Sequence, residues 1–174
     1  MKRNPAKAAA ALALTLAACP LPQPLNEFYD GGSVTPPIIL TDQVVPQGTL
    51  LLAGKNCPSN SGFALQAAVS SVDTTYPVEA RWFIDYDPRS NWGIYQDDVI
   101  PLTPTETVGS DEFVFVPPPY DGSTALHVVE VVVSNGFAAA GDQSVAQPNR
   151  TARSGFETQL YRFVFEYSDS GTCQ

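Results

Sequence analysis

The nine residues from Val78 to Tyr86 read Val-Glu-Ala-Arg-Trp-Phe-Ile-Asp-Tyr. Alternate positions, starting at Val78, are all apolar, and the positions between them are charged except for Phe83. Period two places one set on each face of a β-strand, whereas a helix would mix the two sets. The segment therefore predicts a strand with one buried face.

Similar patterns fill the chain from residue 36 onward. Residues 126–134 are apolar on both faces apart from His127, Glu130 and the last residue, Ser134, which is typical of a central, well-covered strand. Turn residues such as Asn135-Gly136 separate the segments, and sixteen prolines disfavour long helices. The other candidate strands are 38–45, 49–53, 63–71, 92–100, 112–116 and 160–167. Seven or eight short strands predict an all-β chain that folds as an antiparallel β-sandwich.

Two of these segments resemble Ig-like domains of the polycystic-kidney-disease type. Residues 80–87 (Ala-Arg-Trp-Phe-Ile-Asp-Tyr-Asp) are similar to the Trp-centred strand of that family. Residues 127–136 (His-Val-Val-Glu-Val-Val-Val-Ser-Asn-Gly) are similar to its valine-rich strand and the Asn-Gly turn after it. The aromatic-Gly-Asp-Gly turn of the family is replaced here by Asp85-Tyr86-Asp87-Pro88. The resemblance implies an Ig-like sandwich and no particular activity.

The first residues have the pattern of an export signal. Lys2, Arg3 and Lys7 precede an apolar run of eleven residues, 8–18, which is too short to span a bilayer as a helix. The run ends in Leu16-Ala17-Ala18-Cys19, which resembles the bacterial lipobox. The resemblance implies cleavage before Cys19, a diacylglycerol thioether on its sulfur and acylation of the new amino group.

Domain boundaries and location follow from this resemblance. We expect a signal peptide over 1–18, a lipidated cysteine with a Pro-rich flexible tether over 19–35, and one Ig-like sandwich over 36–174. Several acyl chains would hold the protein at a membrane of the cell envelope. Pro20, rather than Asp, follows the cysteine, and in enteric bacteria this favours delivery to the outer membrane.

Three cysteines are an odd number for an exported protein. If Cys19 is lipidated, Cys57 and Cys173 remain as a pair in an oxidising compartment. Cys57 would follow the first edge strand and Cys173 the last strand. These two edge strands run parallel in an Ig-like sandwich, so their ends lie at one pole. We therefore predict a Cys57–Cys173 disulfide.

The mature chain is strongly acidic. It carries 18 acids against six bases once the signal peptide is removed, a balance of −12. Such a surface would be repelled by a phosphate backbone, which argues against a nucleic-acid partner.

Acidic residues are densest over 85–98, where Asp85, Asp87, Asp97 and Asp98 are candidate calcium ligands. The EF-hand register fails, because Arg89 and Ser90 occupy positions five and six of that loop. A solvated acidic loop is the simpler interpretation. Trp92 and Tyr95 could stack on a sugar or belong to an edge strand.

The sequence shows no catalytic constellation and no cofactor motif. His127, the single histidine, has no evident nucleophile, and we expect it to be half-buried with a hydrogen bond. The stretch 137–159, with Arg150 and Arg153, is either a binding loop or a hairpin extension. We expect a non-enzymatic module that binds an envelope protein or glycan or forms part of an envelope assembly. The competing hypothesis is a calcium-dependent or carbohydrate-binding or carbohydrate-processing protein using loop 85–98.

Overall fold

A computed structural model describes residues 34–73, 75–89, 93–100, 107–122, 126–139, 147 and 149–174. The chain divides into two units, Met1–Gly32 and Ser33–Gln174, and every described residue belongs to the second. The described residues form strands and loops and contain no helix, so none of them forms an apolar helix long enough to cross a membrane. The expected signal peptide, Cys19 and most of the tether lie outside the described residues.

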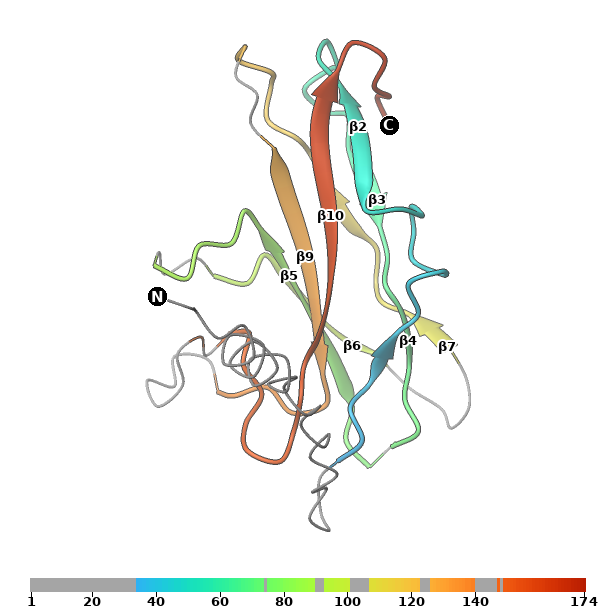
Figure 1. Ribbon diagram of the computed structural model, residues 1–174, viewed down its shortest axis with the longest axis vertical. Helices are drawn as coiled ribbons and strands as arrows, with labels where there is room; N and C mark the ends of the chain where they lie inside the picture. Colours follow the sequence, from blue (N-terminus) through green and yellow to red (C-terminus); the bar gives the residue numbers. More distant parts are fainter. Residues whose placement is uncertain are drawn as a thin grey trace, which may run out of the picture. The chain divides into compact units, whose positions relative to one another are not determined.

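Five strands form the larger sheet, in the order β2-β10-β9-β5-β6 (Figure 1). Neighbours are antiparallel except β2 and β10, which run parallel, so the sheet is mixed. The strands are β2 (Leu50–Gly54), β5 (Val78–Ile84), β6 (Gln96–Ile100), β9 (His127–Ser134) and β10 (Gln159–Ser168). The long central strand β9 is the valine-rich segment expected to be covered on both faces, and its residues 129–134 are buried.

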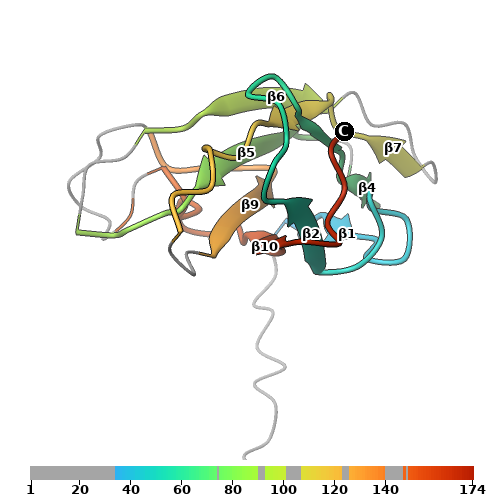
Figure 2. The same cartoon turned by 90° about the horizontal axis from the view of Figure 1, so that it is seen from above.

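Two smaller sheets complete the fold, with β4 between β1 and β7 in one and β3 paired with β8 in the other. Seen along the strands in Figure 2, β1, β4 and β7 lie along one side of the five-stranded sheet. Their bounds are β1 (Ile38–Ile39), β3 (Phe63–Leu65), β4 (Ala68–Ser70), β7 (Thr107–Gly109) and β8 (Phe113–Phe115). The fold is all-β and consistent with the predicted sandwich.

The described residues contain ten strands where seven or eight were expected. The predicted strand 63–71 is divided into β3, which pairs with β8, and β4, which pairs with β1 and β7, and the backbone of Gln66 between them pairs with Val45. Ser110 Oγ accepts the Ala67 N–H, and its carbonyl accepts the Gln66 side-chain amide. Strand β7 was not expected, and only Ile38–Ile39 of the predicted strand 38–45 is extended in a ladder.

The core lies on the inner face of the five-stranded sheet. The alternating residues Val78, Ala80 and Trp82 of β5 are all fully buried, as their period predicted. The expectation of only one buried face is wrong, because Arg81 and Phe83 on the opposite face are buried as well. The Trp82 ring stacks on Phe113 with centroids 4.9 Å apart and packs against Phe163 at 6.2 Å. Aromatic contacts of this kind link the two layers and stabilise the sandwich beyond the burial of apolar area.

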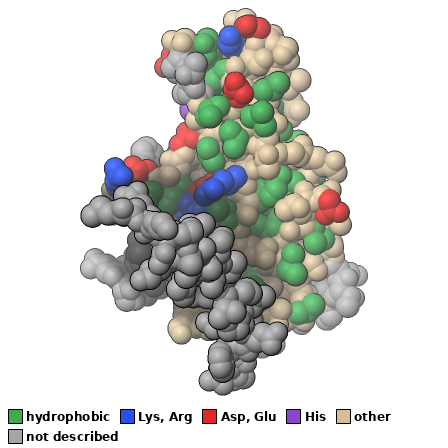
Figure 3. All heavy atoms as spheres, in the orientation of Figure 1, with side chains coloured by type: hydrophobic (Ala, Val, Ile, Leu, Met, Phe, Trp, Pro, Cys, Tyr) green, Lys and Arg blue, Asp and Glu red, His purple; other side chains and the backbone are tan. Residues whose placement is uncertain are grey.

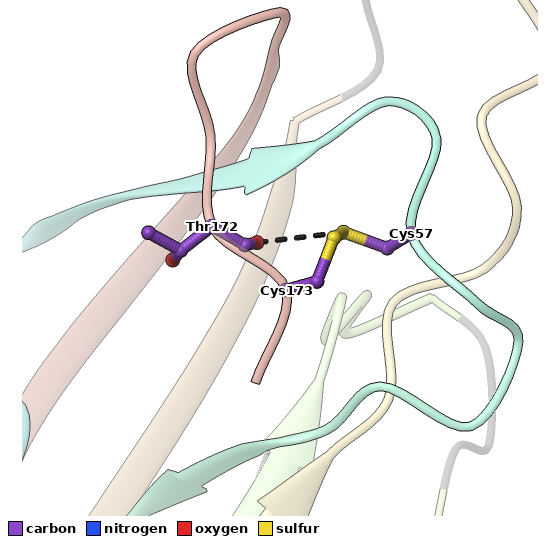
Figure 4. The surroundings of a disulfide bond; sticks show 3 residues. All are labelled: Cys57, Thr172 and Cys173. Atoms are coloured by element: carbon purple, nitrogen blue, oxygen red, sulfur yellow. Dashed lines mark hydrogen bonds between the residues drawn. A yellow bond between two sulfur atoms is a disulfide. The ribbon is translucent and has the colours of Figure 1, made fainter.

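The parallel strands β2 and β10 end at the same pole, which we call the disulfide pole. Cys57 and Cys173 form a disulfide there with Cα atoms 5.3 Å apart, which confirms the predicted pairing (Figure 4). The C-terminal segment runs along β2, because the Thr172 N–H donates to Leu52 O and the Thr172 carbonyl accepts from Gly54. The cross-link therefore fixes the end of the chain to the edge of the sheet.

The domain begins at the opposite pole, which we call the entry pole. The Val34 N–H donates to the carbonyl of Gly155, and the Asn135 side-chain amide donates to the carbonyl of Thr35. Both partners belong to the region between β9 and β10, so the first described residues are joined to the sheet where β10 starts.

Candidate functional site on the outer face of the five-stranded sheet

The outer face of the five-stranded sheet, turned away from the core, carries a groove of about 310 Å³. It lies over the end of β5, the start of β9 and the middle of β10. Val128 and Val164 sit opposite each other in the ladder and form an apolar floor. The other lining residues are Asp85, Tyr86, Glu130 and Arg162.

Glu130 is a buried carboxylate at one end of the groove, and only 6% of its side chain is exposed. Its Oε1 lies 2.6 Å from Arg162 Nε, and its Oε2 lies 2.8 Å from Arg150 Nη1. Arg162 is its cross-strand neighbour in β10, whereas Arg150 comes from the loop before β10. A buried charge is tolerated when it is paired and hydrogen-bonded, and two guanidinium groups meet this need here.

Arg150 contacts two of the residues that line the groove, Glu130 and Tyr86. Its guanidinium lies 4.1 Å from the ring centroid of Tyr86 and 5.3 Å from that of Phe83, which places a cation over two aromatic faces. Because Arg150 is 13% exposed, the ion pair with Glu130 is shielded from solvent on both sides. Arg150 is therefore held by one ion pair and two ring contacts.

The described part of 137–159 forms a hairpin extension, one of the two interpretations the sequence allowed. Phe137 and Ala152 form an antiparallel bridge, and the Ala138 N–H donates to Thr151 O. Arg81, on the outer face of β5, donates to the Asn149 carbonyl at 3.1 Å and lies over the Phe137 ring at 4.0 Å. These contacts hold the returning arm of the hairpin, with Arg150, against the sheet.

Asp85 closes the other end of the groove. Its Oδ2 lies 2.7 Å from His127 Nδ1, and its Oδ1 accepts the Val128 N–H at 2.7 Å. Its own N–H donates to Val128 O, so Asp85 extends the pairing of β5 with β9 by one residue. The φ of +46° at Asp85 then directs the chain out of the sheet, in a region that Asp and Asn tolerate better than most residues.

The four acidic candidates for calcium are not brought together. Asp98 pairs with Ala80 in the β5–β6 ladder. Ala80 precedes Asp85 by five residues, which corresponds to roughly 16 Å along a strand. Asp97 and Asp98 are consecutive strand residues and point to opposite faces. Within the described ranges, no group of three His, Cys, Asp or Glu residues could hold a metal ion.

Asp87 and Asp98, like Asp85, accept hydrogen bonds from backbone N–H groups. The Asp87 Oδ1 accepts the Arg89 N–H at 2.9 Å, and the Asp98 Oδ2 accepts the Asp111 N–H at 2.6 Å. Partial burial raises the pKa of Asp98. The hydrogen bond from the Asp111 N–H lowers this pKa, whereas the negative charges of Asp111 and Asp97 raise it further. Asp98 thus joins the edge strand β6 to the segment before β8.

His127 is half-buried and hydrogen-bonded, as expected, with 16% of its side chain exposed. Glu130 was not recognised as a site residue. The sequence did contain a signal for Glu130, a single acidic residue in a strand that is otherwise apolar on both faces. A buried acid of this kind needs a cationic partner. Cys19 and Trp92 lie outside the described residues, and Tyr95 is 53% exposed.

The groove has the chemistry of a binding surface. Each carboxylate oxygen of Asp85 and Glu130 already has a partner. The apolar floor, Tyr86 and Arg162, which is 59% exposed, are left to contact a ligand. Comparisons with protein-family models, with curated proteins and with solved structures found no match.

Proposed function

We propose that this protein is a lipid-anchored binding module of the cell envelope, held by an acylated Cys19 and recognising its partner through the outer-face groove. The groove is the observation that carries the proposal. It combines an apolar floor, the Tyr86 side chain, whose ring packs against Arg150, and the exposed guanidinium of Arg162 on a well-packed sheet, as binding sites commonly do.

The cysteines support the anchoring part of this proposal. The lipobox-like segment Leu16–Cys19 stands at the end of an apolar run of signal-peptide length. Since Cys57 and Cys173 pair with each other, Cys19 is left over from the three cysteines and is free for lipidation. Acyl chains on this residue would attach the chain firmly without a transmembrane helix.

The position of the groove supports the recognition part. The tether residues 19–35 would join the domain at the entry pole, where Val34 bonds to Gly155. Asp85 and Val128, at the far end of the groove, lie toward the disulfide pole. The groove therefore lies away from the point of attachment, and an envelope partner can reach it.

Mass spectrometry of the mature protein tests the anchor. We expect the N-terminal residue to be Cys19 carrying acyl chains, and Cys19→Ser to move the protein from the membrane to the soluble fraction. An unmodified Cys19 in the membrane-bound protein would contradict the anchor.

Site-specific photo-crosslinking in intact cells tests the groove. A photoreactive residue at Val164, in the floor, should capture a defined partner, whereas one at Val114 should not. Val114 is a matched control because it is an exposed valine on β8, in another sheet. Equal labelling from both positions, or none from Val164, would contradict recognition through this groove.

A further inference from the structure

An apolar patch extends from the groove across three strands of the outer face. We call Leu50, Leu52, Val128 and Val164 the outer patch. Val164 is paired with Leu50 on one side and with Val128 on the other, and Leu52 lies beside Glu166. Leu50 and Leu52 are 55% and 41% exposed. Figure 3 shows hydrophobic side chains gathered on this face above a cluster of basic ones.

Two opposite charges flank the centre of the outer patch. Arg162 precedes Val164 by two residues in β10 and Glu166 follows it by two, so all three side chains lie on the same face of the strand. Arg162 is 59% exposed and Glu166 is exposed. The two charged residues are about 13 Å apart along the strand, with Val164 midway between them.

This arrangement is self-complementary. Suppose that two copies pack with their outer faces together, related by a two-fold axis that lies between the faces, passes Val164 and is perpendicular to β10. The β10 strands of the two copies then run in opposite directions. Arg162 of each copy then faces Glu166 of the other, and the apolar side chains of the two patches cover one another. An interface of this type uses the same residues on both sides and closes at two subunits.

We infer that the outer patch is a self-association surface and that its partner is a second copy of this chain. The inference deepens the proposed function and rests on it, since it names the partner of the same face. A ligand with a single sign of charge would complement only one of the two flanking residues, whereas a second copy complements both. An exposed cation and an exposed anion at this spacing thus favour a copy of the chain over an acidic or basic partner.

The expected association is weak in solution. Four apolar and two charged side chains are fewer than the 20–30 residues a side of a standard interface. Attachment to one membrane would raise the effective concentration of the copies. The opposed strands place the two entry poles at opposite ends. The fifteen tether residues 19–33, which precede the bonded Val34 and Thr35, would reach about 50 Å if extended, and this exceeds the ~33 Å length of β10.

Sedimentation equilibrium of the mature chain carrying Cys19→Ser, over roughly 10–500 µM, tests the inference. We expect a reversible monomer–dimer equilibrium. Glu166→Arg should weaken it about tenfold or more, because the introduced guanidinium would face Arg162 of the other copy. Val164→Glu should weaken it similarly, since two carboxylates would meet at the axis. Val114→Glu, on another sheet, should leave it unchanged.

A mixing experiment distinguishes this geometry from any other contact. Arg162→Glu should dimerise poorly alone, but an equimolar mixture with Glu166→Arg should form a heterodimer, because two opposite-charge pairs reappear. Thermal unfolding will show whether Arg162→Glu remains folded next to Glu130; if it does not, Val164→Glu and Glu166→Arg decide the question.

A chain that stays monomeric at all concentrations, or a dimer indifferent to Glu166→Arg and Val164→Glu, overturns the inference. If such a monomer still gives a defined crosslink from Val164 to another polypeptide in cells, only the self-association is wrong and the groove remains a binding site. If no crosslink forms either, the proposed function fails as well.

Discussion

Asp85 and His127 join the end of β5 to the start of β9: Asp85 Oδ2 lies 2.7 Å from His127 Nδ1, and the other carboxylate oxygen accepts the Val128 N–H. Two side-chain bonds and one backbone bond thus converge where Asp85, at a φ of +46°, leaves the sheet. We expect Asp85→Ala to lower the free energy of unfolding by about 1–3 kcal/mol, because charge-assisted bonds are lost and a left-handed conformation is imposed on alanine.

The asparagine variant at the same position separates these causes. Asp85→Asn keeps an oxygen acceptor and tolerates the positive φ, so its loss should be smaller than that of alanine. Urea unfolding of the three proteins provides the comparison. An Asp85→Ala protein as stable as the wild type would show that this junction does not matter for the fold.

Glu130 should be the most sensitive charged residue of the groove. Glu130→Ala leaves the shielded guanidinium of Arg150 without its counter-ion, and breaking a buried pair in this way typically costs about 3–5 kcal/mol. We also expect faster hydrogen exchange at the Ala138 amide, which bonds to Thr151 in the hairpin that Arg150 anchors. Glu166→Ala, on the exposed part of the same sheet face, is the control, and an equal loss there would argue against a special role for the buried pair.

The disulfide should contribute strongly to stability because it closes a long loop. Cys57 and Cys173 are 116 residues apart, and the chain-entropy model gives about 4–5 kcal/mol for a loop of this length as an upper value. The double variant Cys57→Ser/Cys173→Ser should therefore unfold at much lower urea concentration. Cys19→Ser should leave the midpoint unchanged, and a double variant with the wild-type midpoint would contradict the estimate.

The raised pKa of Asp98 predicts how the free energy of unfolding depends on pH. Burial raises its pKa, so the folded state keeps a proton that the unfolded chain has released. The stabilisation by this proton is complete below the unfolded pKa near 4 and is lost as the pH rises through the raised pKa of the folded state. Asp98→Asn retains an oxygen for the Asp111 N–H without carrying a charge.

We therefore expect Asp98→Asn to gain stability relative to wild type at neutral pH and to show no such gain at pH 3. The gain should be less than about 1 kcal/mol, because the side chain is only partly buried and solvent screens its charge. Thermal unfolding at several pH values measures it, with the exposed Asp42→Asn as control. A gain that is independent of pH would contradict the assignment.

Much of the architecture was predictable because it depends on neighbours along the chain. The alternation around Trp82 predicted both the strand and its buried face, since successive side chains of a strand point to opposite sides whatever the strand packs against. The cysteine count and the order of the strands predicted the Cys57–Cys173 pair, because the ends of two parallel edge strands meet at one pole. Lipidation of Cys19 remains a prediction.

The groove depends on contacts that no local pattern contains. Asp85 meets His127 and Glu130 meets Arg150 because the order β10-β9-β5 and one returning hairpin bring together residues 20 to 42 positions apart. The same ladder separates Asp85 from Asp98, although both lie in the acidic stretch that suggested a calcium loop. Periodicity along the sequence thus determined the strands and their faces, whereas the tertiary structure alone decided which charges pair, since pairing depends on strand order and register across the sheet.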